Sequence, residues 1–245
     1  MRRFFIPPEH IHGSVAVLRD AQTVHHIRDV LRLAIGDEVA CFDGQGQEYL
    51  GRITGTGADE VRLALERRAA RDVSRTALWL LQAIPKGERF DWLLEKATEL
   101  GVERLWPMIT ARTVVRVTPQ QAPRKLERWR RVAQAAAQQC GRSTLPVVES
   151  LVSFEPALEA IRDVPLVVMP TLAVPTVLLA DALRAHPHVD RVAVLIGPEG
   201  DFTPDEVRLA ERVGAQPVSL GPLTLRSETA ALAALSMLQF ALAAE

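Results

Sequence analysis

The chain has 245 residues, a mass of 27.0 kDa and a formal net charge of −1, which suits one large or two ordinary soluble domains. No apolar run reaches the ~18 residues of a membrane span; residues 229–244 come near it but are short and alanine-rich, and therefore predict a buried helix. Only Cys41 and Cys140 occur, in separate segments, which argues against a disulfide framework or a zinc site.

The two ends of the chain differ in charge. Residues 1–142 contain 23 Lys and Arg against 17 Asp and Glu, whereas residues 143–245 contain 6 against 13. The basic front half suggests a surface that binds a polyanion, with ordinary solvated surface as the alternative. At the N-terminus, prolines and Glu9 interrupt the apolar segment too early for a signal peptide, so we expect a cytoplasmic protein.

Residues 1–71 predict a small β-rich domain. Short strands separated by glycine turns are expected at 4–6, 14–18, 38–43, 48–53 and 60–65, a pattern typical of a small barrel. In one predicted helix, at 22–31, Arg28 and Arg32 are four residues apart on one face, where an RNA backbone could be contacted. The polar stretch 69–75 marks the expected domain boundary, so the second domain spans residues 72–245.

From residue 76 onward strands and helices alternate, which predicts an open parallel sheet with flanking helices. Strands are expected at 76–84, 105–109, 146–148, 166–169, 192–196 and 217–220. Helices are expected at 90–100, 154–161, 176–185 and 204–213, with a basic helix opening at Pro123 and a long helix opened by residues 226–229.

Several lysine and arginine residues lie at positions where their charge is not expected to stabilise the fold. Lys86 and Arg89 lie at a strand-to-helix junction, where a cation opposes the helix dipole at a cost of a few tenths to about 1 kcal/mol. Arg128, Arg130 and Arg131 fall mostly opposite the apolar stripe of the basic helix, where they could contact phosphates. Both groups suggest an RNA-binding role, and solvated surface is the alternative.

Two strand-to-helix turns near the C-terminus carry the predicted chemistry. Residues 196–202 follow a buried strand, and residues 221–225 follow the next one; Thr203 and Glu206 after the first turn predict a capping box. Ligands bind outside the carboxyl ends of parallel strands, yet neither turn has the glycine pattern of a phosphate site. Compact apolar loops favour a neutral or zwitterionic ligand, such as adenosine with a sulfonium tail, and plain tight turns are the alternative.

Five motifs in order resemble the RsmE family of 16S ribosomal RNA (uridine-N3) methyltransferases, in the SPOUT superfamily. They are residues 26–39, 85–89 with 96–101, 139–143, 196–202, and 220–221 with 225–230. They span nearly the whole chain, and their shared order makes the resemblance specific. One position departs from the family pattern Gly-Pro-Glu-Gly-Gly-Phe: Asp201 replaces the last glycine and adds a Cβ and a negative charge to that loop.

The resemblance implies an α/β protein with an N-terminal PUA-like RNA-binding β-barrel (residues 1–71) and a C-terminal SPOUT methyltransferase domain with a trefoil knot (residues 72–245). It implies S-adenosyl-L-methionine as methyl donor, small-subunit ribosomal RNA as partner, a homodimer that the long last helix would suit, and no metal. Carried onto this sequence, the cofactor-binding residues are Met169, Pro170, Thr171, Leu172, Ile196, Gly197, Pro198, Glu199, Gly200, Leu220, Gly221, Leu223 and Leu225.

Methylation at the N3 atom of uracil needs a site for negative charge and a proton acceptor, because N3 carries a weakly acidic proton. Arg226 is the candidate for holding that charge or orienting the base. Glu228 or Glu199 is the candidate proton acceptor, and for Glu228 helix capping is the alternative. The candidates for RNA placement are Arg28, Arg32, Lys86, Arg89 and Arg142.

Two other functions stay open at this level. A non-catalytic RNA-binding or ribosome-assembly protein would use the same barrel and basic helix without the methyl donor. A hydrolase on an α/β fold is disfavoured, because the sequence lacks the Gly-x-Ser-x-Gly nucleophile motif.

Overall fold

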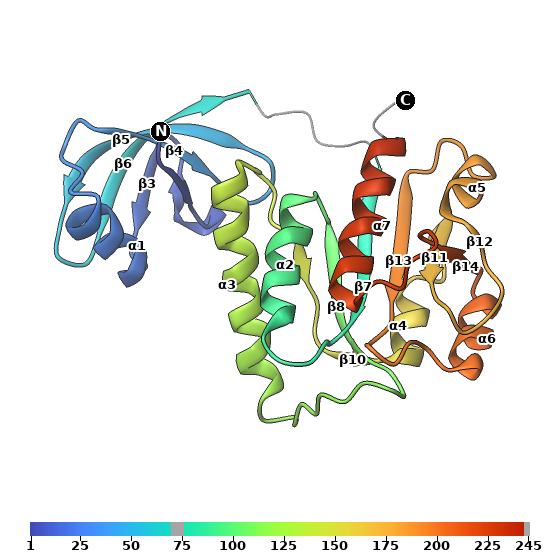
Figure 1. The fold of residues 1–245 in the computed structure, drawn as a ribbon. Coiled ribbons are helices and arrows are strands. Elements are labelled where there is room, and N and C mark those ends of the chain that lie inside the picture. The colour runs from blue at the N-terminus through green and yellow to red at the C-terminus, as the bar shows by residue number, and fades with distance from the viewer. Residues whose placement is uncertain (70–75, 243–245) are drawn as a thin grey trace. The chain divides into compact units, whose positions relative to one another are not determined.

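The computed structural model describes residues 1–69 and 76–242, which form two compact units (Figure 1). The first unit comprises Met1–Val73 and Ala137–Leu145, and the second comprises Ser74–Ala136 and Pro146–Glu245. The connector expected at the domain boundary falls almost entirely on residues 70–75, which lie outside the described residues. A short segment from the middle of the chain therefore belongs to the first unit.

The first unit is built on a six-stranded sheet in the order β1-β4-β5-β6-β3-β2. β1 is parallel to β4, and the other pairs are antiparallel. Along β6 the side chains alternate between buried and exposed, as the period of a strand requires. The strands are β1 (Arg3–Phe5), β2 (Ile11–His12), β3 (Val15–Leu18), β4 (Glu38–Phe42), β5 (Glu48–Thr56) and β6 (Val61–Arg68), with a 3-10 turn, η1 (Pro8–His10), before β2.

The helix expected at residues 22–31 is divided. It consists of α1 (Ala21–His25) and one π-helical turn, η2 (His26–Val30). The prediction that Arg28 and Arg32 share a helical face is wrong, because η2 ends before Arg32, whose φ of 53° lies in the left-handed region. Arg28 instead binds the carboxylate of Asp29 through Nε and Nη2, at 2.8 Å each, and donates from Nη1 to the Ala58 carbonyl at 2.8 Å.

The Arg28–Asp29 contact predicts a pH effect. Hydrogen bonds from Arg28 and then His25 lower the pKa of Asp29 to about 2. A lowered carboxyl pKa stabilises the folded chain above the unfolded pKa of 3.8, and this contribution is lost as the pH falls toward 2. We expect the Asp29 carboxyl carbon to remain in its ionised NMR position at about pH 3. In Arg28→Ala its titration should move upward, and a wild-type midpoint at 3.8 would show that the contact is absent in solution.

The second unit contains an eight-stranded sheet in which every described pairing is parallel, as the alternation of strands and helices predicts. The order is β10-β8-β7-β13-β11-β14-β12, and β9 pairs with β8. The strands are β7 (Ala77–Ala83), β8 (Arg104–Ile109), β9 (Val147–Val148), β10 (Val152–Ser153), β11 (Leu166–Pro170), β12 (Val177–Leu178), β13 (Arg191–Ile196) and β14 (Ala215–Ser219).

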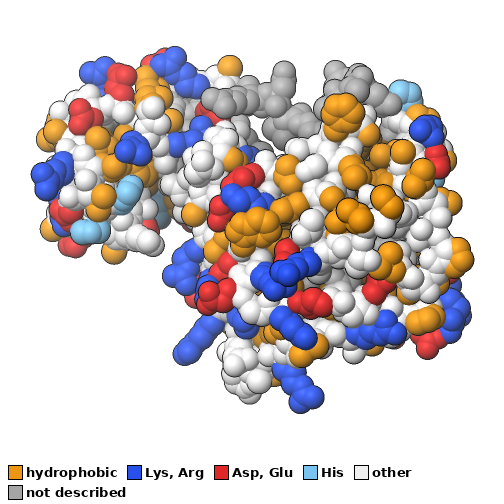
Figure 2. Space-filling view, viewed as in Figure 1, with side chains coloured by type: hydrophobic (Ala, Val, Ile, Leu, Met, Phe, Trp, Pro, Cys, Tyr) orange, Lys and Arg blue, Asp and Glu red, His pale blue; other side chains and the backbone are white. Residues whose placement is uncertain are grey.

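Helices cover both faces of this sheet. α2, α3, α5 and α7 pack on one face and α4 and α6 on the other, so that Val194 of β13 belongs to one core cluster and Leu195 to the second. Figure 2 shows hydrophobic side chains gathered over α7 on the visible face. The helices are α2 (Arg89–Glu99), α3 (Ala122–Cys140), α4 (Phe154–Ala160), α5 (Leu179–Arg184), α6 (Pro204–Arg212) and α7 (Ser227–Leu242).

Two local expectations have different outcomes. The capping box before α6 is confirmed, since Thr203 Oγ1 accepts from the Glu206 N–H at 3.2 Å and Glu206 Oε2 accepts from the Thr203 N–H at 2.8 Å. The helix expected at 176–185 begins only at Leu179, because the two preceding residues form β12 and pair with β14.

Neither cysteine takes part in a disulfide. Cys41 is buried in β4, and burial raises the pKa of its thiol to about 12, while Cys140 is exposed at the end of α3. No helix within residues 1–69 and 76–242 is long and apolar enough to cross a membrane. The same part of the chain holds no group of three or more His, Cys, Asp or Glu placed to bind a metal ion.

Candidate active site

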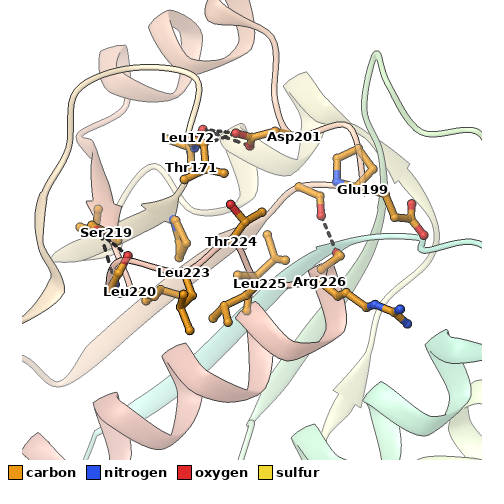
Figure 3. Close-up of a pocket in the computed structure, with 18 residues that line it drawn as sticks. Thr171, Leu172, Glu199, Asp201, Ser219, Leu220, Leu223, Thr224, Leu225 and Arg226 are labelled. Carbon is orange, nitrogen blue, oxygen red and sulfur yellow. Dashed lines mark hydrogen bonds between the residues drawn. The ribbon is translucent and has the colours of Figure 1, made fainter.

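A cavity of about 300 Å³ lies at the carboxyl ends of β11, β13 and β14 (Figure 3). The loops that follow these three strands form its walls, and the first turn of α7 completes it. Parallel strands bring their carboxyl ends to one edge of the sheet, which is why loops far apart in sequence meet here. The lining residues are Pro170, Thr171, Leu172, Ile196, Gly197, Pro198, Glu199, Asp201, Val218, Ser219, Leu220, Gly221, Leu223, Thr224, Leu225, Arg226, Ser227 and Ala230.

The lining contains all the cofactor-binding residues that the sequence predicts, except two. Met169 is fully buried in the core beneath the loop. Gly200 is outside the lining and contacts Arg112: its carbonyl accepts from Arg112 Nη1 at 2.8 Å, and an added Cβ would stand 3.3 Å from the Arg112 Cβ. The cofactor-binding residues predicted from the sequence do not include six lining residues, most of which adjoin or belong to the predicted motifs: Asp201, Val218, Ser219, Thr224, Ser227 and Ala230.

Buried hydrogen bonds fix the loop after β13. Ser227 Oγ donates to the Gly197 carbonyl at 2.5 Å, and Gln82 Nε2 donates to Ser227 Oγ at 2.9 Å. Gln82 is fully buried at the end of β7, so this contact anchors the start of α7 and the loop to the sheet. The cavity wall at Gly197 is therefore held in place before any ligand binds.

The two candidate proton acceptors, Glu199 and Glu228, both lie close to Arg89 beside the cavity. Arg89 Nη1, at the start of α2, lies 3.4 Å from Glu228 Oε1 and 4.0 Å from Glu199 Oε1. Glu199 Oε1 also accepts from the Lys86 N–H at 2.9 Å. Glu228 is buried, with 8% of its surface exposed, and its Oε2 atom has no hydrogen-bond partner among the described residues. A buried carboxylate oxygen without a hydrogen-bond donor can accept a proton from a ligand, or a hydrogen bond from a ligand N–H group.

Arg226 differs from Arg89 in having no charged partner. It lines the cavity, is exposed, and forms no side-chain hydrogen bond or ion pair within residues 1–69 and 76–242. In Figure 3 the side chains of Arg226 and Glu199 both point to the side of the cavity opposite Ser219 and Leu220. The guanidinium is therefore available to a negatively charged ligand atom.

The residues predicted to place RNA are divided between the two units. Lys86 and Arg89 lie beside the cavity in the second unit, whereas Arg28, Arg32 and Arg142 belong to the first. In the basic helix, Arg128 binds Asp91 at 2.6 Å, and Arg130 donates to the Val148 carbonyl at 3.3 Å. Both side chains therefore already have partners within the protein, which the helical periodicity alone does not indicate.

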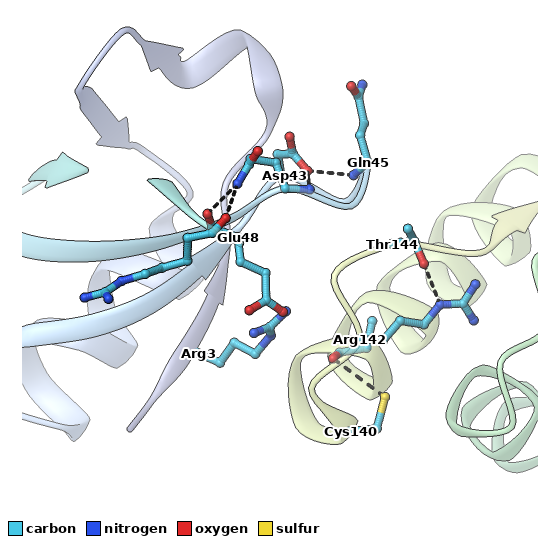
Figure 4. Close-up of polar contacts among 10 residues, drawn as sticks. Arg3, Asp43, Gln45, Glu48, Cys140, Arg142 and Thr144 are labelled. Carbon is cyan, nitrogen blue, oxygen red and sulfur yellow. Dashed lines mark hydrogen bonds and ion pairs between the residues drawn. The ribbon is translucent and has the colours of Figure 1, made fainter. Parts of the chain in front are cut away.

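Arg142 follows α3 in the segment that joins the first unit. Its Nε donates to Thr144 Oγ1 at 2.9 Å (Figure 4). Residues 143–145 pair with the turn after β4, through the Leu145 N–H to the Gly44 carbonyl at 2.9 Å and the Gly46 N–H to the Ser143 carbonyl at 3.1 Å. Arg142 is therefore held on the first unit, which its position in the sequence did not indicate.

Two family models match the chain. The model described as an RNA methyltransferase domain matches residues 73–239, and the model described as an RNA methyltransferase PUA domain matches residues 18–66. Together they cover most of the cavity-bearing unit and, in the first unit, β4, β5 and most of β6.

Known proteins are similar over nearly the full length. The ribosomal RNA small subunit methyltransferase E of Bacillus subtilis is 30% identical over 98% of this chain and 96% of its own, and that of Synechocystis is 32% identical over 96% and 76%. A crystal structure of the Neisseria gonorrhoeae methyltransferase E bound to S-adenosyl methionine has a TM-score of 0.86 at 32% identity, covering 98% of this chain and 97% of that chain. The chain therefore belongs to the ribosomal RNA small subunit methyltransferase E family of RNA methyltransferases.

Proposed function

We propose that this chain binds S-adenosyl-L-methionine in the cavity and transfers its methyl group to N3 of a uridine in 16S ribosomal RNA. The observation that carries the proposal is the cavity formed by three loops at the strand ends of a chain in this family. The similar protein from Neisseria gonorrhoeae was crystallised with S-adenosyl methionine. A non-catalytic role in RNA binding would leave this preorganised cavity unexplained.

The lining residues suit this cofactor. Ile196, Leu220 and Leu225 provide apolar surface for an adenine ring, and the loops present backbone amide and carbonyl groups. Among the residues that the structure describes, no lysine lines the cavity and Arg226 is the single arginine of its lining, in agreement with a ligand that carries no phosphate. The bound cofactor supplies an electrophilic methyl group on a sulfonium centre, and the protein aligns it with the nucleophile.

We assign the proton acceptor to Glu228 rather than Glu199. Oε1 of Glu199 is already engaged by the Lys86 N–H and lies near Arg89, so this side chain connects two loops. Glu228 keeps a buried oxygen without a donor and lies next to Arg226 and Ser227, which line the cavity. Arg89 then orients the carboxylate of Glu228, and Arg226 stabilises the negative charge that develops on the uracil.

The first unit is proposed to bind the ribosomal RNA, with residues 1–71 as a PUA-like domain and residues 72–245 as the methyltransferase domain. The match of residues 18–66 to an RNA methyltransferase PUA domain supports this division. Arg32, Arg142 and Lys86 are retained as RNA contacts. Arg28 is a weaker candidate, since its guanidinium already binds Asp29 and two backbone carbonyls.

We also propose a cytoplasmic homodimer with a trefoil knot in the second domain. On the second unit, three large apolar side chains of α2 and α7 are exposed: Trp92 by 47%, Met237 by 43% and Phe240 by 84%. Covering such a surface with a second copy would remove apolar area from water. The knot is proposed from the family resemblance alone.

Calorimetric titration with S-adenosyl-L-methionine tests the cofactor site. We expect saturable binding at one site per chain, and Gly197→Val should weaken it by about fivefold or more, because overpacking of this size costs about 1–3 kcal/mol. A Cβ at Gly197 would stand 3.2 Å from the ring of the fully buried Phe202.

The matched control is Gly55→Val, where an added Cβ meets nothing closer than 3.8 Å. The control should bind like the wild-type protein. Methyl transfer to small-subunit RNA, with the modified atom identified by mass spectrometry of nucleosides, then tests the reaction. A folded wild-type protein that binds no S-adenosyl-L-methionine would contradict the proposed function.

A further inference from the structure

Asp201 connects two of the three loops that line the cavity. Its Oδ2 accepts from the Leu172 N–H at 2.7 Å and from Thr171 Oγ1 at 2.9 Å, and its Oδ1 accepts from Thr171 Oγ1 at 3.0 Å and from the Phe202 N–H at 2.7 Å. Oδ2 therefore has donors from the loop after β11, and Oδ1 has one donor from that loop and one from the loop after β13. Figure 3 shows the carboxylate facing Thr171 and Leu172.

The strand that precedes the third loop, β14, is attached through the same threonine. Thr171 is buried, with 6% of its surface exposed, and its N–H donates to the carbonyl of Val218 at the end of β14 at 3.3 Å. Thr171 Oγ1 also accepts from the Ala173 N–H at 3.1 Å. Asp201, Thr171 and Val218 thus form a continuous network that joins the loops after β13 and β11 to the end of β14.

Asp201 has a backbone conformation that a non-glycine residue does not favour by itself, so its contacts must hold it there. Asp201 has φ of 60°, in the left-handed region that non-glycine residues seldom adopt. Strained residues of this kind persist where surrounding contacts over-determine them. Here the contacts are those of the carboxylate with its three donors, the Thr171 hydroxyl and the Leu172 and Phe202 N–H groups, so a glycine would fit the backbone better but would release the loop after β11.

We propose that Asp201 is a positioning residue that preorganises the cofactor cavity by fixing the loop of Thr171 and Leu172 to the loop of Gly197–Asp201. The inference rests on the proposed function, because it assigns the affinity for S-adenosyl-L-methionine to this connection. Preorganised loops raise affinity by increasing the fraction of molecules competent to bind. Asp201 then acts on cofactor binding and has little part in the methyl transfer itself.

The test compares Asp201→Gly with the wild-type protein in S-adenosyl-L-methionine binding and in steady-state kinetics. We expect the dissociation constant and the KM for S-adenosyl-L-methionine to rise about tenfold. The kcat at saturating cofactor and the KM for RNA should stay within about threefold of the wild-type values. General destabilisation would not confine the effect to cofactor binding in this way. Equal cofactor affinity in Asp201→Gly and wild type would overturn the inference.

Two further variants isolate the connection from backbone strain. Thr171→Val removes the hydroxyl donor at nearly constant volume, and its effect on affinity should not add to that of Asp201→Gly, because both break the same contact. His188→Gly relieves a similar positive φ, of 62°, at a residue outside the cavity lining, and should leave the affinity unchanged. Fully additive losses, or an equal loss in His188→Gly, would contradict the inference.

A ligand-free measurement separates failure of this inference from failure of the proposed function. In the wild-type protein the Leu172 amide proton is hydrogen-bonded to Asp201 although the residue is 71% exposed, so its exchange with solvent should be slow. Exchange should accelerate at least tenfold in Asp201→Gly. Unchanged exchange would contradict the connection itself, whereas accelerated exchange in a protein that binds no S-adenosyl-L-methionine would contradict only the assigned cofactor.

Discussion

Replacement of Glu228 by glutamine is expected to lower kcat by about 10²–10⁴-fold, the usual contribution of a general base. The substitution keeps the size of a side chain that is 8% exposed and retains a carbonyl oxygen for Arg89, which lies 3.4 Å from Oε1. It removes the ability to accept a proton at the unpaired Oε2 atom. Because Glu228 is not part of the cavity lining, the dissociation constant for S-adenosyl-L-methionine should change less than about threefold.

The matched control is Glu199→Gln. Glu199 accepts from the Lys86 N–H at 2.9 Å, a contact that a glutamine oxygen can also make, so the loss of kcat should be clearly smaller than in Glu228→Gln. Rising pH should partly restore the rate of Glu228→Gln, since uracil N3 then loses its proton without help from the protein. A wild-type rate in Glu228→Gln, or the larger loss in Glu199→Gln, would contradict our assignment of the base.

The position of the cavity could be predicted from the sequence because it depends on local patterns and one general rule. Buried strands followed by glycine-containing turns identify strand ends, and parallel sheets gather these ends at one edge. The capping box at Thr203 and Glu206 is likewise complete within four residues. Local chemistry of this kind needs no knowledge of the tertiary structure, and the structure agrees with it.

The contacts that organise the site could not be predicted in the same way. The proximity of Arg89 to both Glu228 and Glu199, and that of Gln82 to Ser227, joins segments that only the complete sheet brings together. Asp201 was visible in the sequence as a departure from the family pattern, but its partners Thr171 and Leu172 were not. These contacts decide which carboxylate is free to react. Local sequence therefore identifies the candidate proton acceptors, and the tertiary structure distinguishes their roles.

The prediction that Arg28 and Arg32 share one helical face failed for a related reason. The spacing of the two arginines predicts a helix that continues through Arg32, whereas the chain forms a π-helical turn that ends at Val30. Arg28 then turns toward Asp29 and the carbonyl of Ala58. Spacing of charges alone did not reveal that one arginine was engaged by the protein itself.

Replacement of Arg226 by alanine is expected to lower kcat by about 10²–10³-fold, the range for loss of one preorganised group that stabilises developing charge. Arg226 lines the cavity, and its guanidinium has no charged partner among the described residues, so truncation leaves no buried carboxylate unpaired. The chain should therefore fold normally. Arg212→Ala, an exposed arginine at the end of α6 and outside the lining, is the matched control and should keep the wild-type rate.

The pH dependence distinguishes how Arg226 acts. A cation beside the uracil favours the anionic form of N3 and so lowers the pKa of the bound base. Its removal should move the pH–rate profile of Arg226→Ala to higher pH, and Arg226→Lys, which keeps the charge, should move it less. Guanidinium ion added to the solution should restore part of the rate of Arg226→Ala and none of that of Glu228→Gln. If Arg226→Ala methylates RNA at the wild-type rate across the pH range, the negative charge on the base is stabilised by another group, and Arg89 is the nearest described cation to the proposed base Glu228.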